Sequence, residues 1–295
     1  GDEVVVSRLD SSSNVAPWRR TAQRAGATVR WGEIDIETCE LPAWQYDDLV
    51  TSRTRLVAIT AASCAVGTCP DLERIARAAR AEQALVVVDA HAAAAFQPLD
   101  MRELGVDVLA LAAQAWGGPP VGALAFADAD LLDRLPSCAL TPHTRGPGRL
   151  ELGPHAQPML AGLVASVDYL AGLDDAARGS RRERLRTSIA SMREYQIGLL
   201  TELVSELRWQ GHVSLIGDPR NRVPVVAFTV TGRKAGEVVD HLATRGVCVS
   251  GDNGRDGVFG ALGVAEVGGA VRVGLGHYTS PAEVARLSSA VSELR

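Results

Sequence analysis

The sequence has 295 residues, of which 46% are hydrophobic and 22% are charged. That balance is typical of a globular protein and excludes disordered and fibrous classes. The net charge of -5 argues against a dedicated nucleic-acid-binding protein, which normally carries a basic surplus. No apolar run approaches the roughly 20 residues that a membrane-spanning helix needs. We therefore expect a soluble cytoplasmic protein that has neither nucleic acid nor a membrane as a partner.

The first half of the chain alternates short apolar segments with helical patterns, which predicts an α/β domain with a mostly parallel sheet. Strands are expected at 3–7, 28–31, 56–60, 84–89, 106–112 and 121–127, and helices at 14–24 and 70–82. The segment 84–89 is a continuous apolar run that ends in the carboxylate of Asp89. Such a run is typical of a central parallel strand whose carboxyl end opens onto a site.

The second half of the chain is helical at first and then mixed, which predicts a smaller α+β domain. Helices are expected at 158–173, 180–209 and 236–245, and strands at 212–216, 223–230 and 270–275. A last helix begins at a capping box formed by Ser280 and Glu283, with Pro281 in its first position. We divide the chain into a large domain, 1–179, and a small domain, 180–295. Because a strand follows Gly1 almost at once, we expect the large domain to be incomplete at its N-terminus.

Side chains that support particular chemistries are scarce in this sequence. Of 30 basic residues only Lys234 is a lysine, so any reaction that needs a lysine amine depends on Lys234. The five cysteines show no paired spacing, and the six histidines form no ligand pair at helical spacing. The cysteines are Cys39, Cys64, Cys69, Cys138 and Cys248. We therefore expect neither a disulfide framework nor a metal site.

Several short motifs, taken together and in order, carry a family resemblance. They are Asn-Val-Ala-Pro-Trp at 14–18, Ser-Cys-Ala-Val-Gly-Thr at 63–68, Val-Val-Asp at 87–89, Trp-Gly-Gly-Pro-Pro-Val-Gly at 116–122, Arg-Leu-Glu-Leu-Gly at 149–153 and Val-Arg-Val-Gly at 271–274 before His277 and Tyr278. The chain resembles the fold-type I, class V aminotransferases, and especially their cysteine desulfurase and selenocysteine lyase branch. The resemblance covers essentially the whole chain.

The resemblance implies a pyridoxal phosphate site, but this sequence lacks its central residue. In the family a lysine forms a Schiff base with the cofactor, and an aspartate keeps the pyridine nitrogen protonated. Asp89 matches that aspartate, and Arg272 matches the arginine that binds the substrate carboxylate. The family's Ser-x-His-Lys motif falls on Ala112, Gln114 and Ala115, so an alanine, Ala115, stands where the lysine is expected.

Other cofactor contacts of the family are also replaced. Ser11 stands at the position of the histidine that stacks on the ring, and Cys64 stands where an asparagine is expected. Ala92 replaces a glutamine or histidine, although His91 lies one step earlier. Pro154 replaces the threonine that reaches the phosphate of the partner subunit. The desulfurases' cysteine loop becomes the glycine-rich segment 251–254. Because these losses are concerted, we expect that the chain forms no Schiff base with the cofactor.

The surviving residues each allow two interpretations. Asp89 and Arg272 are either ligand-binding groups or purely structural ones. His91 either polarises a ligand or is a satisfied polar group near the sheet edge. Cys64 is either a reactive thiol or a small buried hydrophobe, and Trp116 is a candidate to fill the volume left by cofactor and lysine. The glycines of 251–263 favour a flexible loop at the domain junction.

Three functions remain open. The first is a degenerate, dimeric family member that acts as a binding or scaffold protein and holds no cofactor. It takes a small anionic ligand near Asp89 and Arg272, and Asp89 and His91 are its vestigial cofactor-binding residues. The second is an active aminotransferase or cysteine desulfurase-type lyase that uses pyridoxal phosphate. The third is different chemistry in the same cleft, for which we find no coherent nucleophile and base. By the family resemblance we expect a homodimer, with the helix at 158–173 as a candidate interface element.

Overall fold

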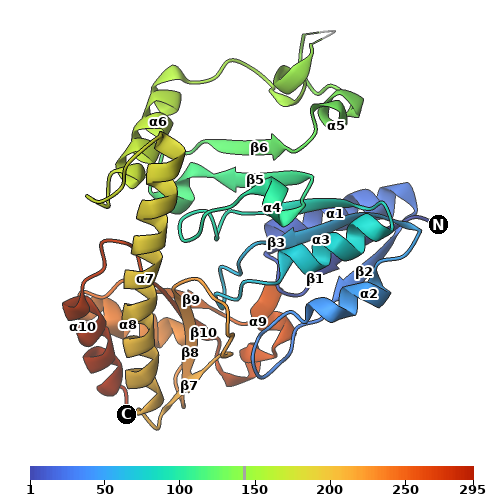
Figure 1. The fold of residues 1–295 in the computed structure, drawn as a ribbon. Helices are drawn as coiled ribbons and strands as arrows, with labels where there is room; N and C mark the ends of the chain where they lie inside the picture. Colours follow the sequence, from blue (N-terminus) through green and yellow to red (C-terminus); the bar gives the residue numbers. More distant parts are fainter. Residues whose placement is uncertain (142–143) are drawn as a thin grey trace.

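The computed structural model describes residues 1–141 and 144–295. The first half of the chain forms a six-stranded sheet in the order β2-β1-β3-β4-β5-β6 (Figure 1). Its strands are β1 (Glu3–Ser7), β2 (Thr28–Gly32), β3 (Thr54–Thr60), β4 (Leu85–Asp89), β5 (Val108–Ala112) and β6 (Gly122–Phe126). All neighbours pair in parallel except β5 and β6, which are antiparallel. The prediction of a mostly parallel sheet is confirmed.

Helices α1 (Ser12–Ala25) and α3 (Leu72–Ala81) cover opposite faces of this sheet. The other helices of this half are α2 (Tyr46–Leu49), α4 (Met101–Leu104) and α5 (Ala129–Arg134). Successive strand residues point to opposite faces. Val57 and Ile59 of β3 pack in the core that contains α3, whereas Ala58 between them packs in the core that contains α1. The short helices α2, α4 and α5 are missing from the sequence prediction, because one or two turns give too little periodicity.

The second half of the chain forms a four-stranded antiparallel sheet in the order β7-β8-β10-β9. The strands are β7 (Val213–Leu215), β8 (Val225–Val230), β9 (Ser250–Asp252) and β10 (Ala270–Gly274). The helices are α6 (Gln157–Ala171), α7 (Arg181–Arg208), α8 (Ala235–Thr244), α9 (Gly257–Ala261) and α10 (Pro281–Ser292). The capping box of Ser280 and Glu283 is confirmed, and Ser180 with Glu183 forms a second one at the start of α7.

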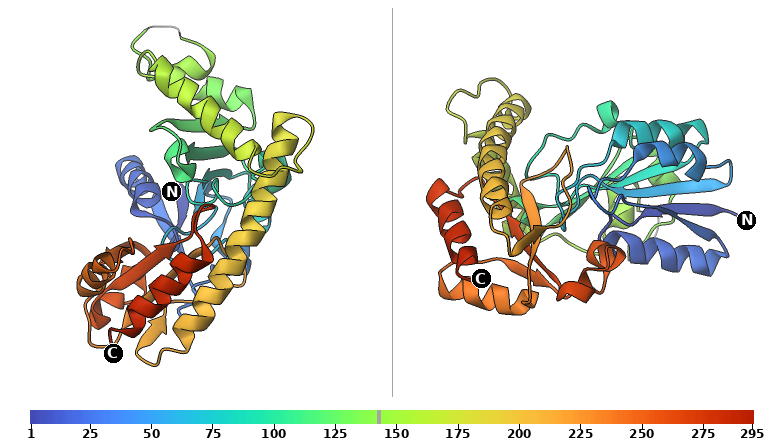
Figure 2. Two further views of the ribbon diagram at one scale, coloured as in Figure 1. Left: turned by 90° about the vertical axis from the view of Figure 1, so that its left-hand side faces the viewer. Right: turned by 90° about the horizontal axis from the view of Figure 1, so that it is seen from below.

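Helix α7 links the two sheets. Figures 1 and 2 show it running from α6, beside the larger sheet, down to the smaller sheet. Its 28 residues correspond to about 42 Å. The lower part of α7 contributes Leu203 and Leu207 to the core of the smaller sheet, where both are fully buried with Phe228. No helix in the described part of the chain is long and apolar enough to cross a membrane.

The prediction of a flexible loop over 251–263 is wrong. Residues Ser250–Asp252 pair with β10 as an edge strand, and Gly257–Ala261 form α9. Glycine is a poor strand and helix former, so sequence reasoning underrates such a segment. Close packing favours glycine at position 251, because a Cβ there would lie 3.0 Å from the Val239 side chain.

Candidate functional site

A cavity of about 410 Å³ lies between the loops that follow β3, β4 and β5 and the smaller sheet. That volume lies within the range of small-molecule sites. Its lining residues are Cys64, His91, Ala92, Phe96, Ala115, Val225, Cys248, Val249, Ser250, Arg272 and Gly274. The structure thus brings together five residues that the sequence singled out: Cys64, His91, Ala92, Ala115 and Arg272.

Arg272 supplies a positive charge to this cavity from β10. Its Nη1 donates to the carbonyl oxygen of Cys64 at 3.0 Å, and its Nη2 donates to Ser250 Oγ at 3.4 Å. Both acceptors are uncharged, so neither neutralises the guanidinium. A guanidinium has five N–H donors, and those left over are suited to a carboxylate or phosphate.

Two carboxylates lie at the carboxyl ends of parallel strands beside the cavity. Asp89 ends β4, is half-buried, and accepts a hydrogen bond from the His91 backbone N–H at 3.0 Å. Asp10 follows β1 and is buried, with Asn14 Nδ2 donating to it at 2.7 Å and the Ser7 hydroxyl also donating. Burial raises the pKa of Asp10 to about 7, and the nearby charge of Asp89 adds to that effect.

Asp10 was missed by the sequence analysis. The signal available was an aspartate at the end of an apolar strand with Asn14 four residues later, at the start of a helix. An aspartate just before a helix is usually an exposed capping residue, so the sequence does not indicate burial. Only the packing of α1 against β1 shows that the carboxyl group is enclosed.

Cys64, Cys248 and His91 expose their side chains at the cavity, which removes the interpretation of Cys64 as a buried hydrophobe. The surrounding protein desolvates the Cys64 thiol and raises its pKa, while Arg272 opposes that shift. Cys248 had not been singled out as a site residue, because a lone cysteine between a helix and a strand gives no sequence signal.

Trp116 does not fill the space beside Ala115, so that idea is wrong. Its Nε1 donates to Ser166 Oγ of α6 at 3.0 Å, and its ring packs with Leu170, Ile189 and Met192. The tryptophan therefore faces α6 and α7, away from the cavity. The glycine-rich turn after it, with Gly117 at a φ of 82°, lets the chain reverse at this point.

Several other candidate residues lie outside the cavity lining. Lys234 is exposed at the start of α8, where its backbone N–H donates to Glu237. Ser11 precedes α1 and its hydroxyl hydrogen-bonds that of Ser13 at 2.7 Å. Gln114 and Pro154 are exposed. Among the described residues no group of three or more histidine, cysteine or acidic side chains is arranged to hold a metal ion.

A family model described as class V aminotransferase matches residues 1–287. The chain belongs to this family. An uncharacterised Mycobacterium tuberculosis (strain CDC 1551 / Oshkosh) protein, MT3887, is 47% identical to this chain over 294 residues, which are 100% of the chain and 74% of that protein. A cysteine desulfurase from Enterobacter sp. (strain 638) is 27% identical, with 100% of this chain and 71% of the relative covered.

The fold agrees with that assignment. The structure of the cysteine desulfurase CsdA from Escherichia coli superposes with a TM-score of 0.86 at 23% identity. The match covers 100% of this chain and 72% of the CsdA chain. The predicted family and fold class are therefore confirmed, and the chain spans about three quarters of the length of these relatives.

Proposed function

We propose that this class V aminotransferase-fold protein forms no Schiff base with pyridoxal phosphate and acts as a binding or scaffold protein whose cleft takes a small anionic ligand. The observation that carries the proposal is the composition of the cavity lining, which contains no amine. Ala115 contributes only a methyl group at the position that the family motif gives to lysine. The single lysine, Lys234, is an exposed residue at the start of α8.

The residues present do not fit a covalently held pyridoxal phosphate. Besides an amine, such a site needs a group to stack on the ring and donors for the phosphate. The Ser11 hydroxyl is engaged with Ser13, and Ala112 carries no donor in its side chain. Pro154 has neither a hydroxyl nor a backbone N–H. The losses inferred from the family motif therefore extend beyond one residue.

An anion is the ligand class that the cleft favours. Arg272 is half-exposed and is held by two neutral acceptors, so its charge remains available to a ligand. Ser250 Oγ and the ring of His91 supply further polar groups at the same cavity. Phe96 and Val249 supply an apolar wall. A small carboxylate with an apolar body matches this lining.

The alternative is an active aminotransferase or cysteine desulfurase-type lyase. It is favoured by the retention of both Asp89 and Arg272, the two residues that match family roles. It requires a cofactor held without a covalent bond or a lysine from another chain.

We also propose that the protein is a cytoplasmic homodimer. Helix α6 supports this, because apolar side chains are exposed along it: Met159, Val164 and Tyr169 are 42%, 48% and 58% accessible. A second copy that packs against α6 would remove part of this exposed apolar area from water.

Thermal-shift titration tests the ligand class. Malonate, phosphate and an uncharged malonamide control are titrated into the wild-type protein and into Arg272→Gln and Arg286→Gln. We expect anion-dependent stabilisation of the wild type and of Arg286→Gln, whose substitution lies on the exposed face of α10. Equal stabilisation of Arg272→Gln by the anions contradicts the proposed role of Arg272.

A further inference from the structure

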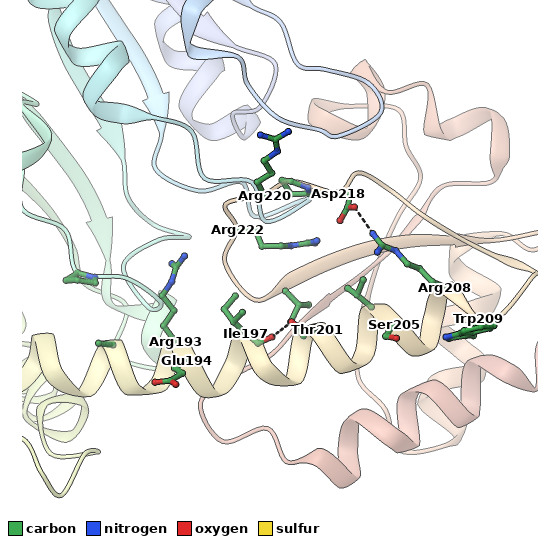
Figure 3. A pocket seen from close by; sticks show the side chains of 15 residues that line it. Arg193, Glu194, Ile197, Thr201, Ser205, Arg208, Trp209, Asp218, Arg220 and Arg222 are labelled. Atoms are coloured by element: carbon green, nitrogen blue, oxygen red, sulfur yellow. Dashed lines mark hydrogen bonds and ion pairs between the residues drawn. The ribbon is translucent and has the colours of Figure 1, made fainter.

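A second cavity, of about 1130 Å³, lies between α7 and the 218–222 segment, and Pro98 of the loop after β4 also lines it. We propose that this groove binds an acidic, partly apolar peptide segment of a partner protein. Its lining residues are Pro98, Ala190, Arg193, Glu194, Ile197, Leu200, Thr201, Val204, Ser205, Arg208, Trp209, Asp218, Pro219, Arg220 and Arg222. Figure 3 shows Arg193 and Trp209 at opposite ends, with Arg222 between them.

The length of the groove favours a peptide over a compact metabolite. Its α7 wall extends from Ala190 to Trp209, and a helical rise over 19 residues corresponds to about 28 Å. An extended peptide covers that distance with about eight residues. A small molecule of the size that suits the cleft would occupy only part of it.

The charge of the groove indicates an acidic partner. Four arginines line it against two acids, Glu194 and Asp218, although the whole chain has a net charge of -5. Asp218 is already paired with Arg208 at 2.7 Å. The local surplus of positive charge therefore comes from the remaining arginines, and charge complementarity favours a partner rich in carboxylates.

Two of these arginines, Arg193 and Arg222, have neutral hydrogen-bond partners inside the protein. Arg193 donates to the side-chain oxygens of Gln97 at 3.1 Å and Asn221 at 3.2 Å. Arg222 Nη2 donates to the carbonyl oxygen of Val225 at 2.7 Å, while its Nε is buried with no hydrogen-bond partner among the described residues. These contacts orient the two guanidinium groups without pairing either of them with a carboxylate of the described residues, so a carboxylate of a partner can bind there.

The floor of the groove is partly apolar, which favours apolar side chains in the partner. Ile197 and Val204, two turns apart on α7, are half-buried and face the groove. Trp209, at the end of the helix, is 87% exposed. Exposed tryptophan and arginine are the residue types enriched at protein-binding hot spots. We therefore expect both acidic and apolar residues in the peptide. A nucleic acid fits less well, because its phosphate backbone would lie against apolar side chains and two carboxylates.

Selection from a displayed library of random peptides tests this inference. The bait is the whole chain, and selected peptides are then measured by fluorescence anisotropy. We expect peptides enriched in Asp, Glu and large apolar residues. Arg193→Glu and Arg220→Glu should each weaken binding about tenfold, and Ile197→Asp by a similar factor. Arg20→Glu, an exposed position on α1, is the matched control and should leave affinity unchanged. Far-ultraviolet circular dichroism and thermal unfolding verify that each variant is folded.

Three outcomes would overturn the proposal. One is that the selected peptides are not enriched in Asp and Glu, or that the Arg193→Glu and Arg220→Glu proteins select the same peptides as the wild type. Another is that an oligothymidylate binds as tightly as the selected peptides and is weakened as much by Arg220→Glu, which would assign the groove to polyanions in general. The third is self-association that Arg220→Glu abolishes, because that would assign the groove to a second copy of this chain.

Discussion

Arg272 of β10 and Cys64 of the loop after β3 are joined by a hydrogen bond of 3.0 Å from Nη1 to the carbonyl oxygen. This bond crosses the cleft between the two sheets. The same loop hydrogen-bonds to the segment before β8, where the Val223 N–H donates to the Gly67 carbonyl at 2.9 Å. The Arg272 side chain therefore has two roles: its hydrogen bond joins the two walls of the cleft, and its guanidinium group supplies a positive charge to the cavity.

Replacement of Arg272 should loosen this connection. Arg272→Met keeps the length of the side chain and removes the donor, so the free energy of unfolding should fall by about 1 kcal/mol. Urea unfolding measures the change, with Arg286→Met on the exposed face of α10 as control. Equal free energies of unfolding for the Arg272 and Arg286 variants would show that the hydrogen bond to Cys64 does not contribute to stability.

Restoring a lysine at Ala115 should not restore a cofactor site. The other contacts expected of the family are missing at Ser11, Ala112 and Pro154, so an amine at position 115 lacks its supporting groups. Ala115→Lys and the amine-free control Ala115→Met are compared after incubation with pyridoxal phosphate and desalting. A strong retained absorbance band in Ala115→Lys alone would contradict the concerted loss of the site.

Stability should depend on pH through Asp10. Its pKa in the folded protein is raised to about 7 from an ordinary value near 3.8, so the folded state keeps a proton that the unfolded state has released. The free energy of unfolding should therefore decrease as pH rises from about 4 to 7. Asp10→Asn removes this dependence, so the variant should gain stability over wild type at pH 8, on the order of 2–4 kcal/mol, and little at pH 4.

Asp240→Asn, at an exposed position of α8, is the control for Asp10. Unfolding by urea is measured across the pH range for all three proteins. A wild-type profile parallel to that of Asp10→Asn would mean that the buried carboxyl does not titrate in this window.

The five thiols should differ in reactivity. Burial raises the pKa of Cys39 and of Cys69 to about 11, which leaves about one thiolate in a thousand at pH 8. Iodoacetamide labelling with mass mapping should therefore modify Cys138 and Cys248 long before Cys39 and Cys69. Malonate in the cleft should protect Cys64 and Cys248 and leave Cys138 unaffected. Labelling of Cys39 at the rate of Cys138 would contradict the burial of its thiol.

Much of the fold is predictable because its strands are strong local signals. The run that ends at Asp89 and the capping box of Ser280 with Glu283 appear at the expected positions. Features that depend on tertiary packing were not predictable. Asp10 is enclosed only when α1 packs on the sheet, and Cys248 reaches the cavity only when the smaller sheet meets the loop after β3. Trp116 was assigned wrongly because its neighbour Ser166 is 50 residues away in sequence.

The most direct test of the central claim is the absorbance spectrum of the protein after incubation with pyridoxal phosphate and desalting, followed by borohydride reduction and peptide mass mapping. We expect no retained band at about 410–420 nm and no labelled peptide. A retained band with the reduced cofactor mapped to a lysine, which in this chain means Lys234, would contradict it and favour an active family enzyme.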